Sequence, residues 1–299
     1  MKIYCTKEDL KKGVQTIQSA LSNRTTLPIL HNFMLETESS KVKVISTDLE
    51  MGVKHYISAE VEADGSITIP AKKFSEILHS LPDDKDVEIS VDAGDKVQLK
   101  CGRSRFSIIG APKSEYPILP EFDQQEAFEL PLGLVSNMVD KTVFAASSDE
   151  TRHVLNGVFW SAKKGNLEMV ATDGRRLSII CMKDVMKDRE FQIIVPTKIL
   201  GELLRLIISF EIKPDSQEKL QIGVTENQIV FKIKETTLLS RLIGGTFPNY
   251  EQVIPKKKDI SLVIDSKELL AVTKRAALCA LDRGGSVKFT LQKNSLHIA

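Results

Sequence analysis

The sequence has little of what would place a chain in a membrane or in an oxidising compartment. Its 299 residues include no run of about 18 apolar residues, so no segment is predicted to span a bilayer. Residues 1–9 alternate in polarity and then turn acidic, which is not the pattern of a signal peptide. The four cysteines lie far apart without CxxC spacing, in apolar or strand-like surroundings. We therefore expect buried free thiols in a reducing cytosol at Cys5, Cys101, Cys181 and Cys279.

Net charge is also scarce. The chain has 41 lysines and arginines against 40 aspartates and glutamates, which gives a net charge of +1. A chain with this balance is not an obvious binder of polyanions as a whole. Any role on nucleic acid therefore requires the basic residues to be gathered on one face.

Motifs for catalysis are missing as well. The five histidines show no HExxH or HxH spacing, and the sequence has no P-loop, GxGxxG or GxSxG segment. Asp48, Glu50 and Asp173 follow strand-like runs, where an aspartate usually caps a turn. A metal-dependent nuclease built from these carboxylates is the alternative hypothesis, but they come from separate repeats and lack supporting ligands. We predict no catalytic residue, no metal and no cofactor.

What the sequence does contain is an internal repeat. Thr47-Asp48-Leu49-Glu50 returns as Thr172-Asp173-Gly174-Arg175, in each case after an apolar run. A second segment, Pro70-Ala71-Lys72-Lys73-Phe74, returns as Pro196-Thr197-Lys198-Ile199-Leu200. Repeats this long indicate domains rather than the turns of a solenoid, whose periods are about 20–50 residues. We predict two complete domains at 1–121 and 122–255 and a partial third at 256–299.

Each complete repeat follows the same order of predicted elements. A short strand leads into a helix, a hairpin follows, a second strand runs into a helix that begins at a proline, and further strands close the unit. Thr6 is predicted to cap the first helix and Ser266 the helix of the third unit, whereas Pro131 suits a first helical position. The pattern predicts an α+β domain of two helices on roughly eight antiparallel strands.

Basic residues recur on the predicted helices, off their apolar stripes. Lys198 and Arg205 are seven residues apart on one stripe, as are Lys267 and Lys274. For any single helix, a solvated face is a sufficient explanation. The same arrangement on five helices of a repeated architecture weakens that explanation: if the helices line one surface, that surface is basic although the net charge is close to zero.

Six segments, in order along the whole chain, carry a resemblance to a known family. Ala171-Thr172-Asp173-Gly174-Arg175-Arg176-Leu177 resembles the ATDGHRL segment of the bacterial DNA polymerase III beta subunits, the sliding clamps. The other matching segments are Thr26–Leu30, Thr47–Met51, Gly102–Ser107, Arg152 with Leu155–Gly157, and Phe247–Tyr250.

The resemblance implies a non-catalytic subunit of the bacterial cytoplasm that forms a head-to-tail homodimeric ring of clamp-fold domains. Strands would form the outside of the ring and basic helices its bore. Such a ring encircles duplex DNA and tethers DNA polymerase III subunits, the clamp loader and other proteins with clamp-binding motifs. Contacts to phosphates alone suit sliding, because phosphates carry no sequence information.

The resemblance and the charge pattern together predict three sets of site residues. The residues expected near DNA phosphates are Arg24, Lys72, Lys141, Arg152, Lys198, Arg205 and Lys274. The residues expected to line a pocket for partner peptides are Leu155, Thr172, Gly174, Arg175, Arg176, Leu177, Pro248 and Val253. The residues expected at the joint between subunits are Lys73, Arg103, Arg105, Phe106, Ile108, Leu278 and Cys279.

The sequence departs from the family pattern in two ways. Arg175 stands where the family motif has histidine, and His153-Val154 stands where an aromatic pair is often found. The third domain also breaks off at Ala299, where a third threonine-aspartate turn would come. A ring of heterologous contacts closes only if that domain is whole, so a polypeptide ending at Ala299 is expected to be monomeric or weakly associated.

Overall fold

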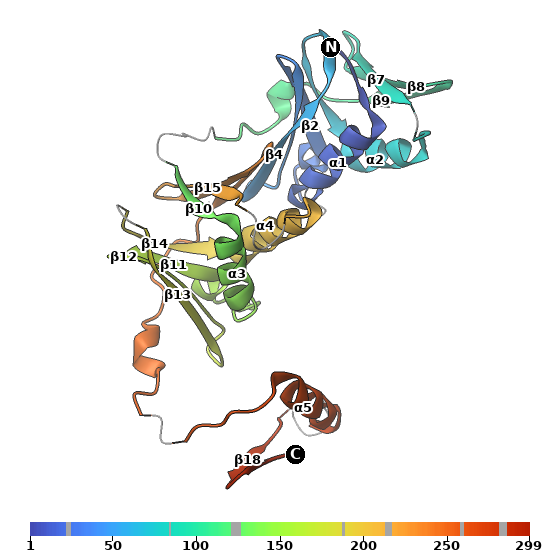
Figure 1. Cartoon of the computed structure of the whole chain (residues 1–299). Helices are drawn as coiled ribbons and strands as arrows, with labels where there is room; N and C mark the ends of the chain where they lie inside the picture. The colour runs from blue at the N-terminus through green and yellow to red at the C-terminus, as the bar shows by residue number, and fades with distance from the viewer. Residues whose placement is uncertain are drawn as a thin grey trace. The chain divides into compact units, whose positions relative to one another are not determined.

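The computed structural model describes residues 1–21, 25–83, 85–120, 127–186, 189–212, 217–257, 260–280 and 286–299. These residues form two units, Met1–Pro248 and Asn249–Ala299 (Figure 1). The first unit contains both complete repeats. No helix in the described ranges is long and apolar enough to cross a membrane.

The first repeat runs from β1 to β9 and carries helices α1 and α2. Its elements are β1 (Lys2–Thr6), α1 (Lys7–Ile17), β2 (Asn32–Glu38), β3 (Lys41–Thr47), β4 (Met51–Ser58), β5 (Glu60–Ala63), β6 (Ser66–Pro70), α2 (Ala71–Ser80), β7 (Asp86–Val91), β8 (Lys96–Cys101) and β9 (Ser104–Ile109). Short 3-10 turns, η2 (Pro28–His31) and η3 (Lys113–Glu115), lie in its connections.

The second repeat has the same order of elements, except that its described residues contain four strands between the two helices where the first repeat has five. They are β10 (Phe128–Pro131), α3 (Leu132–Val143), β11 (Gly157–Lys163), β12 (Gly165–Thr172), β13 (Leu177–Met186), β14 (Phe191–Pro196), α4 (Thr197–Ser209), β15 (Lys219–Val224), β16 (Gln228–Ile233) and β17 (Thr236–Arg241). The second unit contains α5 (Ser266–Ala280), β18 (Phe289–Gln292) and β19 (Ser295–Ile298). The α+β class predicted from the sequence is confirmed.

The strands form antiparallel sheets, one of which crosses from the first repeat into the second. Its order is β10-β15-β16-β17-β4-β3-β2-β6, and the crossing is the pairing of β17 with β4, in which Leu238 faces Val53. The other sheets of the first unit have the orders β5-β1-β7-β8-β9 and β13-β12-β11-β14. Main-chain hydrogen bonds therefore join the two repeats directly.

The residues that precede the helices act as their N-caps. Thr6 caps α1 as predicted, since its hydroxyl accepts a hydrogen bond from the amide of Asp9 at 3.0 Å. Pro131 precedes α3 as its N-cap rather than standing at its first helical position. The prediction for α5 was wrong: Asp265, not Ser266, accepts the amides of Lys267 and Glu268.

One cluster of buried apolar side chains runs through both repeats. Its largest members include Phe33 and Phe74, with ring centroids 5.1 Å apart, and Trp160 and Phe231, 5.9 Å apart. This cluster lies between the sheets and the helices, so it holds the helices in fixed positions on the sheets.

The cysteines divide evenly between core and surface. Cys5 and Cys101 are buried as predicted, and burial raises the pKa of the Cys5 thiol to about 12. Cys181 and Cys279 are exposed, so for them the prediction of burial was wrong. Cys181 lies on β13, an edge strand, and Cys279 lies on α5, where Ala280 is the buried residue among those described.

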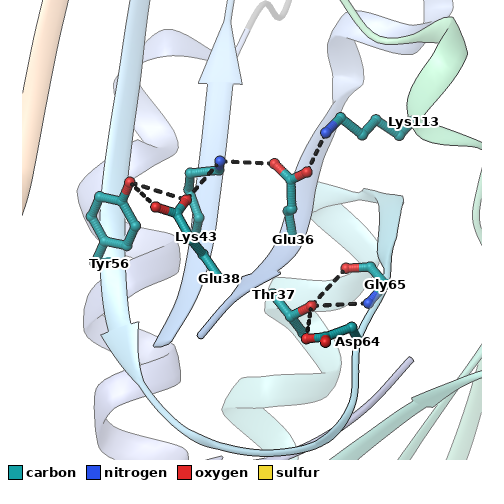
Figure 2. Close-up of polar contacts among 8 residues, drawn as sticks. All are labelled: Glu36, Thr37, Glu38, Lys43, Tyr56, Asp64, Gly65 and Lys113. Carbon is teal, nitrogen blue, oxygen red and sulfur yellow. Dashed lines mark hydrogen bonds and ion pairs between the residues drawn. The ribbon is translucent and has the colours of Figure 1, made fainter. Parts of the chain in front are cut away.

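The face of β2 and β3 that points away from the core carries a network of charges. Figure 2 shows Lys43 between the carboxylates of Glu36 and Glu38, at 2.9 Å from each, and Lys113 on the other side of Glu36. Burial alone would raise the pKa of Glu36, but the hydrogen bonds from Lys113 and Lys43 lower it below its ordinary value. The network ties η3, at the end of the first repeat, to its sheet.

Candidate functional site

The repeated Thr-Asp segment forms a tight turn between β12 and β13, which we call the Asp173 turn (Thr172–Arg176). One carboxylate oxygen of Asp173 accepts the amides of Arg175 and Arg176 at 2.9 and 3.0 Å. Gly174 adopts a φ of +84°, which glycine tolerates without strain. These backbone amides, with the Arg176 side chain, hold the pKa of Asp173 below its usual range. The turn is therefore rigid, and its carboxylate stays ionised.

Two arginines decorate this turn. Arg176 Nε donates to the second oxygen of Asp173 at 3.0 Å, and its guanidinium lies 5.7 Å from the ring centre of Phe144. Arg152 donates to the carbonyl oxygen of Asp173 at 3.3 Å. Arg152 was predicted as a phosphate neighbour, yet the structure brings it to the turn that was predicted to line the peptide pocket.

Phe144 and Leu177 lie beside the same turn, Phe144 against the Arg176 guanidinium and Leu177 as the next residue of the chain. Leu155 is buried, Leu177 is half-buried, and Phe144 is 57% exposed. Phe144 was missed in the sequence, although an aromatic residue directly after a helix, where the core stripe has ended, is a usable signal. Pro248 is exposed at the end of the first unit, and Val253 is 70% exposed in the second unit. An exposed aromatic ring next to an arginine, as at Phe144 and Arg176, is suited to a short peptide with a hydrophobic anchor and a polar end.

The α-helices α1 to α4, in the described part of the first unit, form a continuous row, which we call the helix row. α2 packs beside α1 and α3 beside α4, while Arg205 of α4 donates to a carbonyl of α1. Figure 1 shows the resulting order α2-α1-α4-α3 along one side of the sheets. Helices that are distant in sequence thus share one surface.

The residues predicted to contact phosphates differ in how free their charges are. Lys72 on α2 and Lys141 on α3 are exposed and have no acidic partner among the residues that the structure describes. Lys198 pairs with Asp48, and Arg205 pairs with Glu202. Lys274 is exposed on α5 in the second unit, and Arg24 lies outside the described residues.

Asp48 and Asp173, the aspartates of the nuclease hypothesis, accept hydrogen bonds from backbone amides of their own turns. Asp48 accepts the amides of Glu50 and Met51 at 3.1 and 2.8 Å and pairs with Lys198. In the described part of the chain, no group of three or more His, Cys, Asp or Glu residues could hold a metal ion.

Comparison with known families accounts for both repeats. Residues 1–120 match the N-terminal domain of the DNA polymerase III beta subunit, and residues 129–249 match its central domain. The chain belongs to the DNA polymerase III beta subunit family. It is accordingly a beta sliding clamp, a processivity factor and a non-catalytic subunit of DNA polymerase III. The nuclease hypothesis was therefore wrong, because the carboxylates of Asp48 and Asp173 belong to structural turns.

Relatives and solved structures agree with this assignment. The chain is 33% identical over 296 residues to the beta sliding clamp of Bacillus subtilis, covering 96% of this chain and 76% of that protein. It is 31% identical to the beta sliding clamp of Haemophilus influenzae, covering all of this chain and 80% of the relative. The crystal structure of the Bacillus subtilis sliding clamp superimposes with a TM-score of 0.91 at 32% identity, covering 100% of this chain and 80% of that one.

Five of the seven residues predicted for the joint between subunits lie at or near an open sheet edge in the first repeat. β9 is an edge strand, α2 packs near it, and Arg103, Arg105 and Lys73 are exposed. Ile108 is only 5% exposed, so it packs into its own core, whereas Ile109 is 79% exposed and was missed. Leu278, 73% exposed, and the exposed Cys279 lie on α5 of the second unit.

Proposed function

We propose that this sliding clamp, when its third domain is complete, encircles duplex DNA as a homodimeric ring in the bacterial cytoplasm, with the helix row facing the duplex. The domains of this chain would be 1–121, 122–255 and a partial third at 256–299. The observation that supports the proposal is the helix row itself, which presents Lys72 and Lys141 as exposed charges without acidic partners in the described ranges. Phosphates are the natural ligands of such charges, and a surface that contacts phosphates alone can slide.

The second part of the proposal concerns partners. DNA polymerase III subunits, the clamp loader and other proteins with clamp-binding motifs would insert a short peptide at the Asp173 turn. Leu177, Phe144 and Leu155 would receive its apolar side chains, and Arg175 and Arg176 would meet its polar end. Arg175, in place of the histidine of the family motif, would make this end of the site more favourable to acidic peptides.

Encirclement is tested by retention. The protein, loaded by a bacterial clamp loader onto a nicked circular duplex, is expected to stay with the DNA through gel filtration and to leave it once the circle is cut. Light scattering on the same preparation establishes whether the subunits are dimeric. A dimer that elutes identically from circular and linear DNA would contradict encirclement.

The peptide site is tested by substitution. Leu177→Lys is expected to weaken the binding of a clamp-binding peptide by at least tenfold, because it places a charge where an apolar anchor would sit. Ile109→Lys, which places the same charge at an exposed apolar position on β9, is the control and should leave peptide affinity unchanged. Unaltered affinity in a folded Leu177→Lys protein would exclude this location.

A further inference from the structure

Arg205 and Glu202 of α4 form an ion pair that is hydrogen-bonded to the first repeat. We call Glu202, Arg205 and the carbonyl of Thr16 together the polar bracket. Arg205 Nε donates to one oxygen of Glu202 at 2.8 Å, and Arg205 Nη2 donates to the other at 2.6 Å. The same Nη2 also donates to the carbonyl oxygen of Thr16 at 3.1 Å. Glu202 is only 6% exposed, so its charge has to be compensated within the protein.

The position of Thr16 explains what the bracket does. Thr16 lies in the last turn of α1, where carbonyl oxygens lack partners within the helix and the helix dipole favours a cation. α1 has no basic residue of its own in that turn. Arg205 supplies this cation from the other repeat. Since Glu202 neutralises Arg205, the bracket joins α4 to α1 without adding net positive charge to the helix row.

Lys198 makes a second link from the same helix. It pairs with Asp48, whose side chain is 11% exposed and is already held by the amides of Glu50 and Met51. The amide of Arg241, at the end of β17, donates to the carbonyl of Glu50 at 2.9 Å and fixes the same turn from the second repeat. Both basic residues of the α4 stripe, two helical turns apart, are thus engaged by the first repeat.

We infer that Arg205 and Lys198 are positioning residues, which set the orientation of α4 against α1 and hence the angle between the first two repeats. They are not phosphate contacts. The curvature of the helix row then depends on interactions between repeats, while its attraction for DNA comes from other lysines. The statement about DNA rests on the proposed function, but the statement about orientation does not.

The orientation is measured with spin labels at Glu76→Cys on α2 and Lys163→Cys at the end of β11. Both positions are exposed, and Cys181→Ser and Cys279→Ser remove the exposed native thiols. Arg205→Gln is expected to broaden or shift the distribution of distances between the labels, and Arg205→Lys to restore part of it. Hydrogen exchange of the amides of residues 14–17 is expected to accelerate about tenfold in Arg205→Gln, because a charged hydrogen bond is lost there. Lys72→Gln is the matched control and should change neither readout.

Duplex binding separates the two roles. Arg205→Gln is expected to leave the slope of log affinity against log salt unchanged, whereas Lys72→Gln should reduce its magnitude by about 1. An unaltered distance distribution together with a reduced slope in Arg205→Gln would overturn the inference. If neither variant changes the slope, the proposed DNA contact fails, while the spin-label result still decides the positioning role. If Arg205→Gln does not fold, Lys198→Gln provides the distance distribution and the salt slope.

Discussion

The Asp48 turn (Thr47–Met51) and the Asp173 turn have the same backbone but different surroundings. In each, one carboxylate oxygen accepts the amides two and three residues ahead, and the residue after the aspartate has a positive φ, +77° at Leu49 and +84° at Gly174. The other oxygen of Asp48 pairs with Lys198 of the next repeat, whereas that of Asp173 pairs with Arg176 of its own turn.

The strands that follow the two turns differ in the same way. β4 pairs with β17 where the two repeats meet, whereas β13 is an edge strand. The local sequence therefore determines the turn, and the neighbouring repeat determines whether the turn becomes part of a joint or stays available to a ligand. The four predictions below test this comparison, starting with the largest expected effect.

Gly52 lies on β4, where the two repeats meet, and should not tolerate replacement by a large side chain. A Cβ atom there would lie 2.8 Å from Leu119 Cδ1 and 3.2 Å from Leu239 Cδ1. Gly52→Leu is expected to lower the free energy of unfolding by about 3 kcal/mol through overpacking. Leu177, at the corresponding position of the open turn, provides the control, since Leu177→Ala should cost about 1 kcal/mol. Urea unfolding of both variants decides, and equal losses would remove the distinction between closed and open turns.

The two aspartates should respond differently to the loss of charge. Asp48→Asn keeps the acceptor for the backbone amides but removes the ion pair with Lys198, and about 1–2 kcal/mol of stability should be lost. Asp173→Asn should cost less, because the side chain of Asp173 is 24% exposed whereas that of Asp48 is only 11% exposed. Chemical denaturation of the pair, with Lys198→Met as a third variant, measures the difference. A larger loss at Asp173 would contradict the assignment of Asp48 to the joint.

Substitutions at the residue with positive φ should change the stability of the protein in opposite directions at the two turns. Leu49→Gly is expected to stabilise the protein by about 0.5–1 kcal/mol, because glycine accepts this backbone conformation and leucine does not. Gly174→Ala should destabilise by about 1 kcal/mol and displace Arg152, whose Nη1 lies 3.2 Å from the added Cβ. Thermal unfolding gives both values, and a destabilising Leu49→Gly would show that the Leu49 side chain contributes packing that outweighs its strain.

The Asp173 turn should also have a signature at acidic pH. The amides of Arg175 and Arg176 and the Arg176 side chain lower the pKa of Asp173 in the folded protein. Its contribution to stability is therefore complete above the unfolded pKa of about 3.9 and is lost as the pH falls through the lower folded value. A carboxyl NMR titration should place its midpoint below about 3.9, and Asp173→Asn should flatten the acid limb of the stability curve. A midpoint at or above the unfolded value would exclude the hydrogen-bonded turn.

Much of the local structure could be predicted from the sequence, because its causes are local. Thr6 and Asp9 are three residues apart and form the predicted cap of α1. β4 shows no simple alternation of buried and exposed residues, so its bounds could not be read from the sequence. The pairing of β4 with β17 joins segments far apart in the chain, and no local pattern specifies it.

The candidate site was predicted in part. The Asp173 turn could be predicted from the repeat, but the contact that α4 makes with the first repeat could not. Glu202 and Arg205 stand three residues apart on one helix, a spacing at which opposite charges meet, so their pairing was readable. That Glu202 is buried and that Arg205 reaches Thr16 depend on how the two repeats pack, which the sequence of one helix does not contain.

The salt dependence of duplex binding tests the central claim. The claim is that the helix row attracts DNA through Lys72 and Lys141 rather than through Lys198 and Arg205, which link the two repeats. Fluorescence anisotropy would compare the parent protein with the double variant Lys72→Gln, Lys141→Gln and with Lys96→Gln on β8 as the control. The account predicts that the double variant lowers the magnitude of the slope of log affinity against log salt by about 1.8, with the same loss for duplexes of unrelated sequence. A slope equal to that of the parent, or a loss confined to one base sequence, would contradict it.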